Sequence, residues 1–153
     1  MCLRAISFDG ALVAIICVLC LPGFAQSEHA DAKKSAARSS QPMVDRGRYI
    51  AEDLAVCGQC HTPRDDQGNL DRSKWLEGAP LWLNPARPTQ GWPLQAPRIA
   101  GDPPGTDAEM IKLLTTGIWR DGKPLRAPMP QFHMSVSDAQ AVLAYLKSLT
   151  PQH

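Results

Sequence analysis

The sequence predicts one small all-α domain behind an N-terminal leader, and three observations support this fold class. The chain has 153 residues, a length that suits a single small domain with a leader. Two segments late in the chain begin with capping boxes and continue with apolar residues at helical spacing. No segment has the alternating pattern of a convincing strand, and the sequence contains no internal repeat.

Residues 1–25 are expected to form a secretory signal. Arg4 precedes an apolar run over residues 11–24, and Ala25 offers a small residue at the offset required for cleavage. The apolar run is too short to span a membrane comfortably. An uncleaved membrane anchor and a lipid anchor at Cys20 remain as alternatives. Export predicts a periplasmic location. We expect contact with a membrane only if the signal is uncleaved or if the protein belongs to a larger complex.

The chain after the leader divides into a tether and a folded domain. Residues 26–42 are rich in Ser, Ala and Lys with few bulky apolar residues, which predicts a disordered tether. The folded domain is expected over residues 43–151. The leader holds only Arg4 and Asp9 as charged residues, so the remainder carries 15 Lys and Arg against 14 Asp and Glu. This balance argues against a nucleic-acid binder.

The first helix of the domain is expected over residues 44–60. Val44, Ile50 and Leu54 form part of a helical apolar stripe. Gly47 is costly inside a helix unless another segment packs against the bare backbone. Its presence indicates a close helix crossing at this position.

The chemistry of the chain is concentrated in Cys57-Gly58-Gln59-Cys60-His61. Cys-x-x-Cys-His is the attachment signature of c-type haem, and this sequence contains it once. Both thiols lie on one face of a helical turn, where they can add to the two haem vinyl groups, and the imidazole becomes an axial iron ligand. A zinc site would need further ligands, a thioredoxin-like pair would need a preceding strand, and a plain disulfide does not require the histidine.

Residues 62–105 predict a long proline-rich loop that packs on a buried cofactor rather than on itself. No helical or strand period survives this density of prolines, although a short helix near residues 70–76 is possible. Trp75, Trp82 and Trp92 are interspersed among the prolines. The prolines are Pro63, Pro80, Pro85, Pro88, Pro93, Pro97, Pro103 and Pro104.

Two further helices follow the proline-rich segment. Thr106-Asp107-Ala108-Glu109 is a capping box that predicts a helix closed by Gly117. Ser137-Asp138-Ala139-Gln140 is read as a second capping box, opening a last helix that stops before Pro151. The apolar side of that last helix carries Val142, Leu143, Tyr145, Leu146 and Leu149.

A six-coordinate iron needs a second axial ligand, and Met129 is the preferred candidate. Pro128 and Pro130 stiffen the backbone on both sides of it, so the loop can present a thioether from a rigid frame. Met134 and His133 remain as alternatives. The less suitable candidates are Met110, with core spacing, Met43, at the domain edge, and the terminal His153.

Three further residues are expected near the cofactor. The second nitrogen of the His61 imidazole should donate to a backbone carbonyl, and the carbonyl of Pro80 is the choice here. The haem propionates need hydrogen-bond donors, for which Arg98 and Trp119 are candidates.

Taken together, these residues resemble the class I cytochromes c over about residues 44–150. The resemblance rests on Gly47, on the Cys57–His61 motif, on Met129 between two prolines, and on the final Ala144-Tyr145-Leu146-Lys147-Ser148-Leu149. It implies a fold in which the N- and C-terminal helices cross around the haem, glycine against aromatic, with Gly47 near Tyr145. The early position of the motif disfavours the cytochrome c′ type.

Within that family the chain is similar to the monohaem cytochrome subunits of periplasmic dehydrogenases. The carrying segments are Cys60-His61-Thr62-Pro63-Arg64, Leu114-Thr115-Thr116-Gly117 and Met129-Pro130-Gln131-Phe132. Relatives often read Pro-Asn-Ile-Thr where this chain reads Pro97-Arg98-Ile99-Ala100, a departure in the segment that approaches the haem edge.

The resemblance implies a periplasmic one-electron carrier with one covalent haem c and His61/Met129 ligation. A dehydrogenase would be the electron donor, and an oxidase or another cytochrome the acceptor. Arg120, Lys123 and Arg126 would form a basic rim beside the haem edge. The alternatives are a haem subunit fixed in a larger dehydrogenase or respiratory complex, and a haem enzyme with a labile sixth ligand.

Overall fold

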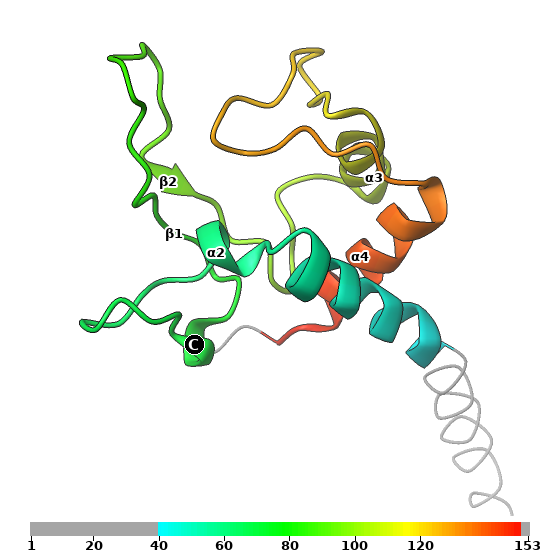
Figure 1. The fold of residues 1–153 in the computed structure, drawn as a ribbon. Helices are drawn as coiled ribbons and strands as arrows, with labels where there is room; N and C mark the ends of the chain where they lie inside the picture. Colours follow the sequence, from blue (N-terminus) through cyan, green and yellow to red (C-terminus); the bar gives the residue numbers. More distant parts are fainter. Residues whose placement is uncertain (1–39, 151–153) are drawn as a thin grey trace, which may run out of the picture. The chain divides into compact units, whose positions relative to one another are not determined.

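The computed structural model describes residues 40–150. The predicted signal, residues 26–39 of the predicted tether, and residues 151–153 lie outside the described residues. Residues 40–49 are helical and continue into a π-helical turn, η1. The elements, in chain order, are η1 (Ile50–Leu54), α2 (Gly58–His61), η2 (Arg72–Lys74), β1 (Ala79–Pro80), β2 (Gln95–Ala96), α3 (Asp107–Thr116) and α4 (Val136–Ser148). Figure 1 labels the α-helices and the strands among them.

The described part of the chain is rich in helix and poor in strand, in agreement with the predicted all-α class. The only ladder among residues 40–150 is the antiparallel pair β1 and β2, with Ala79 opposite Ala96 and Pro80 opposite Gln95. Such a short pairing leaves no alternating pattern in the sequence, and for that reason it was not predicted. Within the same residues, no helix combines the length and the apolar character needed to cross a membrane.

The first helix differs from its prediction at both ends. It already includes residues 40–42, before the expected domain start at residue 43. It ends at Leu54 rather than Cys60, because residues 55–57 turn the chain before α2 begins. Val56 makes this turn with a φ of 46°, a left-handed conformation that a β-branched residue rarely adopts.

Gly47 packs directly against α4, which confirms the expected contact with Tyr145. A Cβ atom at residue 47 would overlap the carbonyl of Ala141 and crowd the Cβ atom of Tyr145. The bare glycine backbone therefore lets the first helix approach α4 closely, which offsets its low helix propensity.

The capping box at Thr106 is confirmed, and the one at Ser137 is wrong. The Thr106 side chain accepts the backbone N–H of Glu109, and Gly117 closes α3 in the left-handed region at a φ of 70°. The N-cap of α4 is Ser135, whose hydroxyl accepts the backbone N–H of Asp138. The last helix thus begins about half a turn earlier than expected.

The core lies between the first helix, α3 and α4. Its main cluster is formed by Ile50, Ala51, Leu76, Ile99, Ala100, Leu114, Ala139, Val142, Tyr145 and Leu146. A smaller cluster joins α3 to α4 through Met110, Leu113 and Leu143. Leu76, Ile99 and Ala100 belong to the proline-rich stretch, so this stretch contributes to the core as well as to the surface.

Two indole N–H groups donate hydrogen bonds to backbone carbonyls in and beside the proline-rich segment after α2. Trp82 donates to the carbonyl of Gln59 at 3.1 Å, and Trp92 donates to the carbonyl of Leu83 at 3.0 Å. The short helix expected near residues 70–76 is present as η2, capped by Asp71. Tryptophans and short turns thus order a segment that has little regular structure.

Candidate functional site

The Cys57–His61 motif forms a single helical turn, α2. Cys57 is its N-cap residue, and the backbone carbonyl of Cys57 accepts a hydrogen bond from the backbone N–H of His61 at 3.0 Å. Cys57 and Cys60 are free, partly buried thiols. The turn therefore carries two thiols and an imidazole within five residues, which is the spacing that covalent haem attachment requires.

The His61 imidazole is buried and has one ring nitrogen without a hydrogen-bond partner among the described contacts. It is only 6% exposed, and its Nδ1 lies 2.7 Å from the carbonyl oxygen of Pro97, so Nδ1 carries the proton and Nε2 is left to bind a metal. Burial lowers the pKa of the imidazole, and the Pro97 hydrogen bond only partly opposes this effect. The neutral form is the one that coordinates iron.

The carbonyl that orients His61 is Pro97 and not Pro80, which corrects the sequence-based choice. Both prolines border the short ladder, because Pro80 ends β1 and Pro97 follows β2 directly. The prediction that a proline carbonyl fixes the ring is confirmed; its position is wrong. The sequence does not reveal which of the two carbonyls faces the imidazole.

The environment of Cys57 argues against a thiol redox pair. Burial raises the pKa of its thiol to about 11, so the group is protonated at neutral pH. Redox-active cysteines instead have lowered pKa values that favour the thiolate. Among residues 40–150, no three His, Cys, Asp or Glu side chains are grouped as metal ligands. The donor set fits covalent haem better than the alternatives.

Residues 75–78 wrap around the α2 turn. The indole of Trp75 lies against Gly58, where a Cβ atom would overlap the ring. The backbone N–H of Leu76 donates to the Thr62 hydroxyl at 3.0 Å, and that of Gly78 donates to the His61 carbonyl at 2.8 Å. Sequence reasoning missed Trp75 and Gly58 as site residues. The glycine between the two cysteines was the one signal available.

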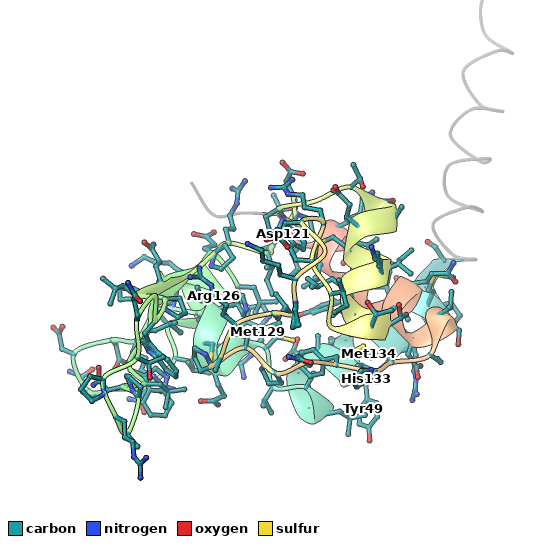
Figure 2. All side chains as sticks on the ribbon, turned by 90° about the horizontal axis from the view of Figure 1, so that it is seen from above. Tyr49, Asp121, Arg126, Met129, His133 and Met134 are labelled. Atoms are coloured by element: carbon teal, nitrogen blue, oxygen red, sulfur yellow. The ribbon has the colours of Figure 1, made fainter. Side chains whose placement is uncertain are left out.

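The candidates for the second axial ligand lie in the loop between α3 and α4 (Figure 2). Met129 is partly buried, and its backbone N–H donates to the Arg126 carbonyl at 3.2 Å. Met134 packs against the main core and donates its N–H to the Leu114 carbonyl at 3.0 Å. His133 is exposed. Among the described contacts, none joins Met129 to His61, so its role as a ligand stays a prediction.

The two residues expected near the propionates have different surroundings. Arg98 is exposed. Its backbone directly follows Pro97, whose carbonyl is held by the hydrogen bond from His61. Trp119 packs against the smaller core cluster, and the Arg120 guanidinium lies 5.0 Å from the centre of its ring. Trp119 thus has a packing role that is independent of any cofactor. The propionate role of both residues stays a prediction.

Comparisons with known proteins agree on one family. A family model for cytochrome c matches residues 44–150. The fructose dehydrogenase cytochrome subunit of Gluconobacter japonicus is 28% identical over 116 residues, which cover 69% of this chain and 22% of the subunit. A diheme cytochrome c-type protein of Cereibacter sphaeroides is 54% identical over 39 residues, 26% of this chain and 13% of that protein. The matches thus span less than a quarter of either relative.

Proposed function

This chain belongs to the cytochrome c family, and from that premise we propose that it carries single electrons on one covalently bound haem c. The observation that carries the proposal is the state of His61. A buried imidazole whose Nδ1 is committed to the Pro97 carbonyl directs Nε2 toward a metal, and it directly follows two cysteines at haem-attachment spacing.

The chain's own residues divide the work of holding the group. Cys57 and Cys60 would supply the two thioether links, and His61 would supply one axial nitrogen. The haem, when bound, contributes an iron that exchanges one electron between its ferrous and ferric states. The Pro97 carbonyl holds the imidazole in one tautomer and one orientation, so the ligand does not reorganise when the charge changes.

Met129 is our proposed second axial ligand. Its competitor Met134 already has a place in the core and a backbone hydrogen bond to Leu114, while His133 points from an exposed position. Met129 lies between two prolines and is itself partly buried. A sixth ligand from the protein would exclude substrate and water from the iron and would favour electron transfer over bond chemistry.

The proposed architecture is that of a class I cytochrome c. The N- and C-terminal helices would cross at Gly47 and Tyr145, and the proline-rich segment would enclose one side of the haem. The close approach of Gly47 to Ala141 and Tyr145 supports this arrangement.

We place the carrier in the periplasm, with a dehydrogenase as its electron donor and an oxidase or another cytochrome as acceptor. The apolar run in residues 11–24 and the similarity to a dehydrogenase cytochrome subunit support this. The same similarity supports a second candidate, a haem subunit fixed in a larger complex. Co-purification from native membranes and periplasm separates the two: a free carrier elutes alone.

The central test is covalent attachment. The exported wild-type chain should retain one haem after acid–acetone extraction, with the spectrum expected for two thioether links. Cys57→Ala and Cys60→Ala should each lose most of the covalent haem, since each removes one link. A folded, exported wild-type chain without haem would falsify the proposal.

A further inference from the structure

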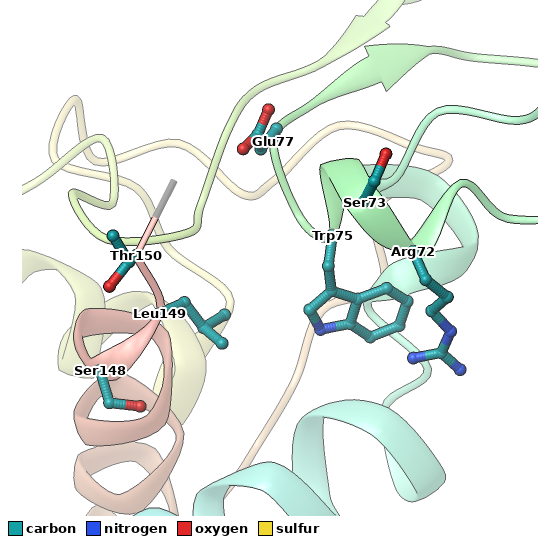
Figure 3. A pocket seen from close by; sticks show the side chains of 7 residues that line it. All are labelled: Arg72, Ser73, Trp75, Glu77, Ser148, Leu149 and Thr150. Carbon is teal, nitrogen blue, oxygen red and sulfur yellow. The ribbon is translucent and has the colours of Figure 1, made fainter. Parts of the chain in front are cut away.

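Three segments that are distant in sequence meet at the hydroxyl of Tyr145. The indole N–H of Trp75 donates to this hydroxyl at 2.9 Å, and the hydroxyl donates to the carboxylate of Glu52. Arg72 forms a salt bridge with Glu52 at 3.3 Å, and its guanidinium lies 4.0 Å from the centre of the Trp75 ring, beside the indole in Figure 3. Arg72, Glu52, Tyr145 and Trp75 are called the Tyr145 network below.

Helix packing alone does not require the polar part of this network. The Cβ atom of Tyr145 provides the contact with Gly47, and phenylalanine would provide the same atom and ring. The hydroxyl is instead occupied on both sides, as an acceptor for Trp75 and a donor to Glu52. Because Tyr145 is 4% exposed, removing the hydroxyl would leave the Trp75 indole without its acceptor, while Glu52 would keep its salt bridge with Arg72.

The other end of the network rests on the haem-attachment turn. The Trp75 ring covers the Gly58 backbone, and the residues after Trp75 donate hydrogen bonds to Thr62 and to the His61 carbonyl. The segment therefore contacts both the first residue of α2 and its C-terminal end. Any displacement of Trp75 therefore moves the ring against which the first residue of α2 packs.

We propose that the Tyr145 network positions the haem-attachment turn, by fixing Trp75 on Gly58 and thereby the orientation of Cys57 and His61 relative to α4. Its members are positioning residues, because they act through the turn and do not themselves bind the cofactor. The inference rests on the proposed function, since the turn's orientation matters only if it holds the haem.

The experiment compares three variants of the full exported chain with wild type. Tyr145→Phe removes the shared hydroxyl, Trp75→Phe removes the indole donor, and the third variant combines both. Trp92→Phe is the matched control, because the Trp92 indole also donates a hydrogen bond, here to the Leu83 carbonyl, but lies outside the network. Two quantities are measured: the midpoint reduction potential of the haem, and hydrogen exchange at the Leu76 and Gly78 amides.

The network variants should loosen the turn and admit water near the iron, which favours the ferric state. We expect the redox equilibrium to shift about threefold toward ferric, about 30 mV at 59 mV per tenfold change. Exchange at Leu76 and Gly78 should be roughly tenfold faster, because those amides donate to the turn. The double variant should add little to either single one, since all three break one linked set. Trp92→Phe should leave both quantities near wild type.

A lower unfolding temperature with the potential and both amides unchanged would overturn the proposal, because that result describes helix packing alone. If Tyr145→Phe does not fold, Glu52→Gln and Glu52→Leu replace it. Glutamine keeps an acceptor for the Tyr145 hydroxyl and should preserve amide protection, whereas leucine should lose it. If wild type carries no covalent haem, the proposed function fails, and exchange at Leu76 and Gly78 still decides the positioning claim.

Discussion

The two segments that carry the proposed iron ligands are held in opposite ways. Around His61, residues 75–78 contact α2 at both ends, and the Pro97 carbonyl fixes the ring. Around Met129, the loop between α3 and α4 is mostly exposed. The described hydrogen bonds nearest Met129 run from its own N–H to the Arg126 carbonyl, at 3.2 Å, and from the Arg126 guanidinium to the Gly91 carbonyl, at 2.9 Å.

This difference indicates a division of roles. Side chains around His61 belong to the main core or pack against it, so a change there should alter both folding and haem attachment. On the Met129 side, Phe132 and Met134 pack against the core but Met129 does not belong to it, so a change at Met129 should alter ligation while the fold persists. The predictions below test this division, beginning with the largest expected effect.

The largest effect is expected at Gly58. Gly58→Ala places a methyl group into the Trp75 ring and should cost about 1–3 kcal/mol of unfolding free energy. In a Trp75→Leu background the extra cost should fall to about 0.5 kcal/mol or less, because the obstructing ring is gone. Denaturant unfolding of the holoproteins measures both. Gly68→Asn is the control, as residue 68 has open space and a φ of 84° that asparagine tolerates. Equal costs in both backgrounds would refute the contact.

Met129 and Met134 should separate ligation from stability. Met129→Ala should abolish the absorption signature of thioether-ligated ferric haem and open the iron to carbon monoxide. Met134→Ala should keep that signature but cost about 1–2 kcal/mol, since Met134 packs against the core. Spectra and denaturant unfolding of both variants provide the measurement. The reverse pattern, with the signature lost only in Met134→Ala, would make Met134 the ligand.

Much of the helical frame could be predicted because its signals are local. Thr106 with Glu109 at one end and Gly117 at the other define α3 within a dozen residues. The start of α4 was missed because Ser135 and Ser137 each have a suitable residue three positions later. Met134, which packs onto the core just before Ser135, selects the earlier start. That choice depends on a tertiary contact that no local pattern contains.

The chemistry of the site could be predicted, but its supports could not. The attachment motif names Cys57, Cys60 and His61 without any knowledge of the fold. The carbonyl that orients His61 lies 36 positions further along the chain, and the break after Leu54 depends on a valine in a conformation it disfavours. Both are set by long-range packing around the turn.

A pH effect should come from the His61 side of the molecule. Burial, and then the hydrogen bond to Glu52, raise the pKa of the Tyr145 hydroxyl above its ordinary value of 10.0. The folded chain therefore holds this proton more tightly than the unfolded chain does. The resulting stabilisation is fully present below about pH 10 and is lost as the pH rises further. Tyr145→Phe should weaken this alkaline loss in denaturant unfolding between about pH 9 and about pH 11. Identical pH profiles would contradict the assignment.

The smallest effect is expected at the basic rim on the Met129 side, formed by Arg120, Lys123 and Arg126. All three are exposed, and Asp121 is the only acidic residue between Glu109 and Asp138. Arg126 differs from the other two, because it also donates to the Gly91 carbonyl and so joins two loops. The docking role is therefore tested with Arg120→Gln and Lys123→Gln, which leave that hydrogen bond in place.

If the rim attracts acidic partners, it should also attract a small anionic oxidant such as ferricyanide. Oxidation of the reduced protein should slow as salt rises, and the double Gln variant should lower the low-salt rate by up to about tenfold. Lys147→Gln is the matched control, since this cation is already paired with Asp107 at 2.9 Å. The double variant of Arg120 and Lys123, unlike the control, should also flatten the salt dependence of the rate, because fewer charges remain to be screened. A rate that neither salt nor the substitutions change would assign these residues to solvent alone, and would leave the proposed role of the Met129 loop confined to ligation.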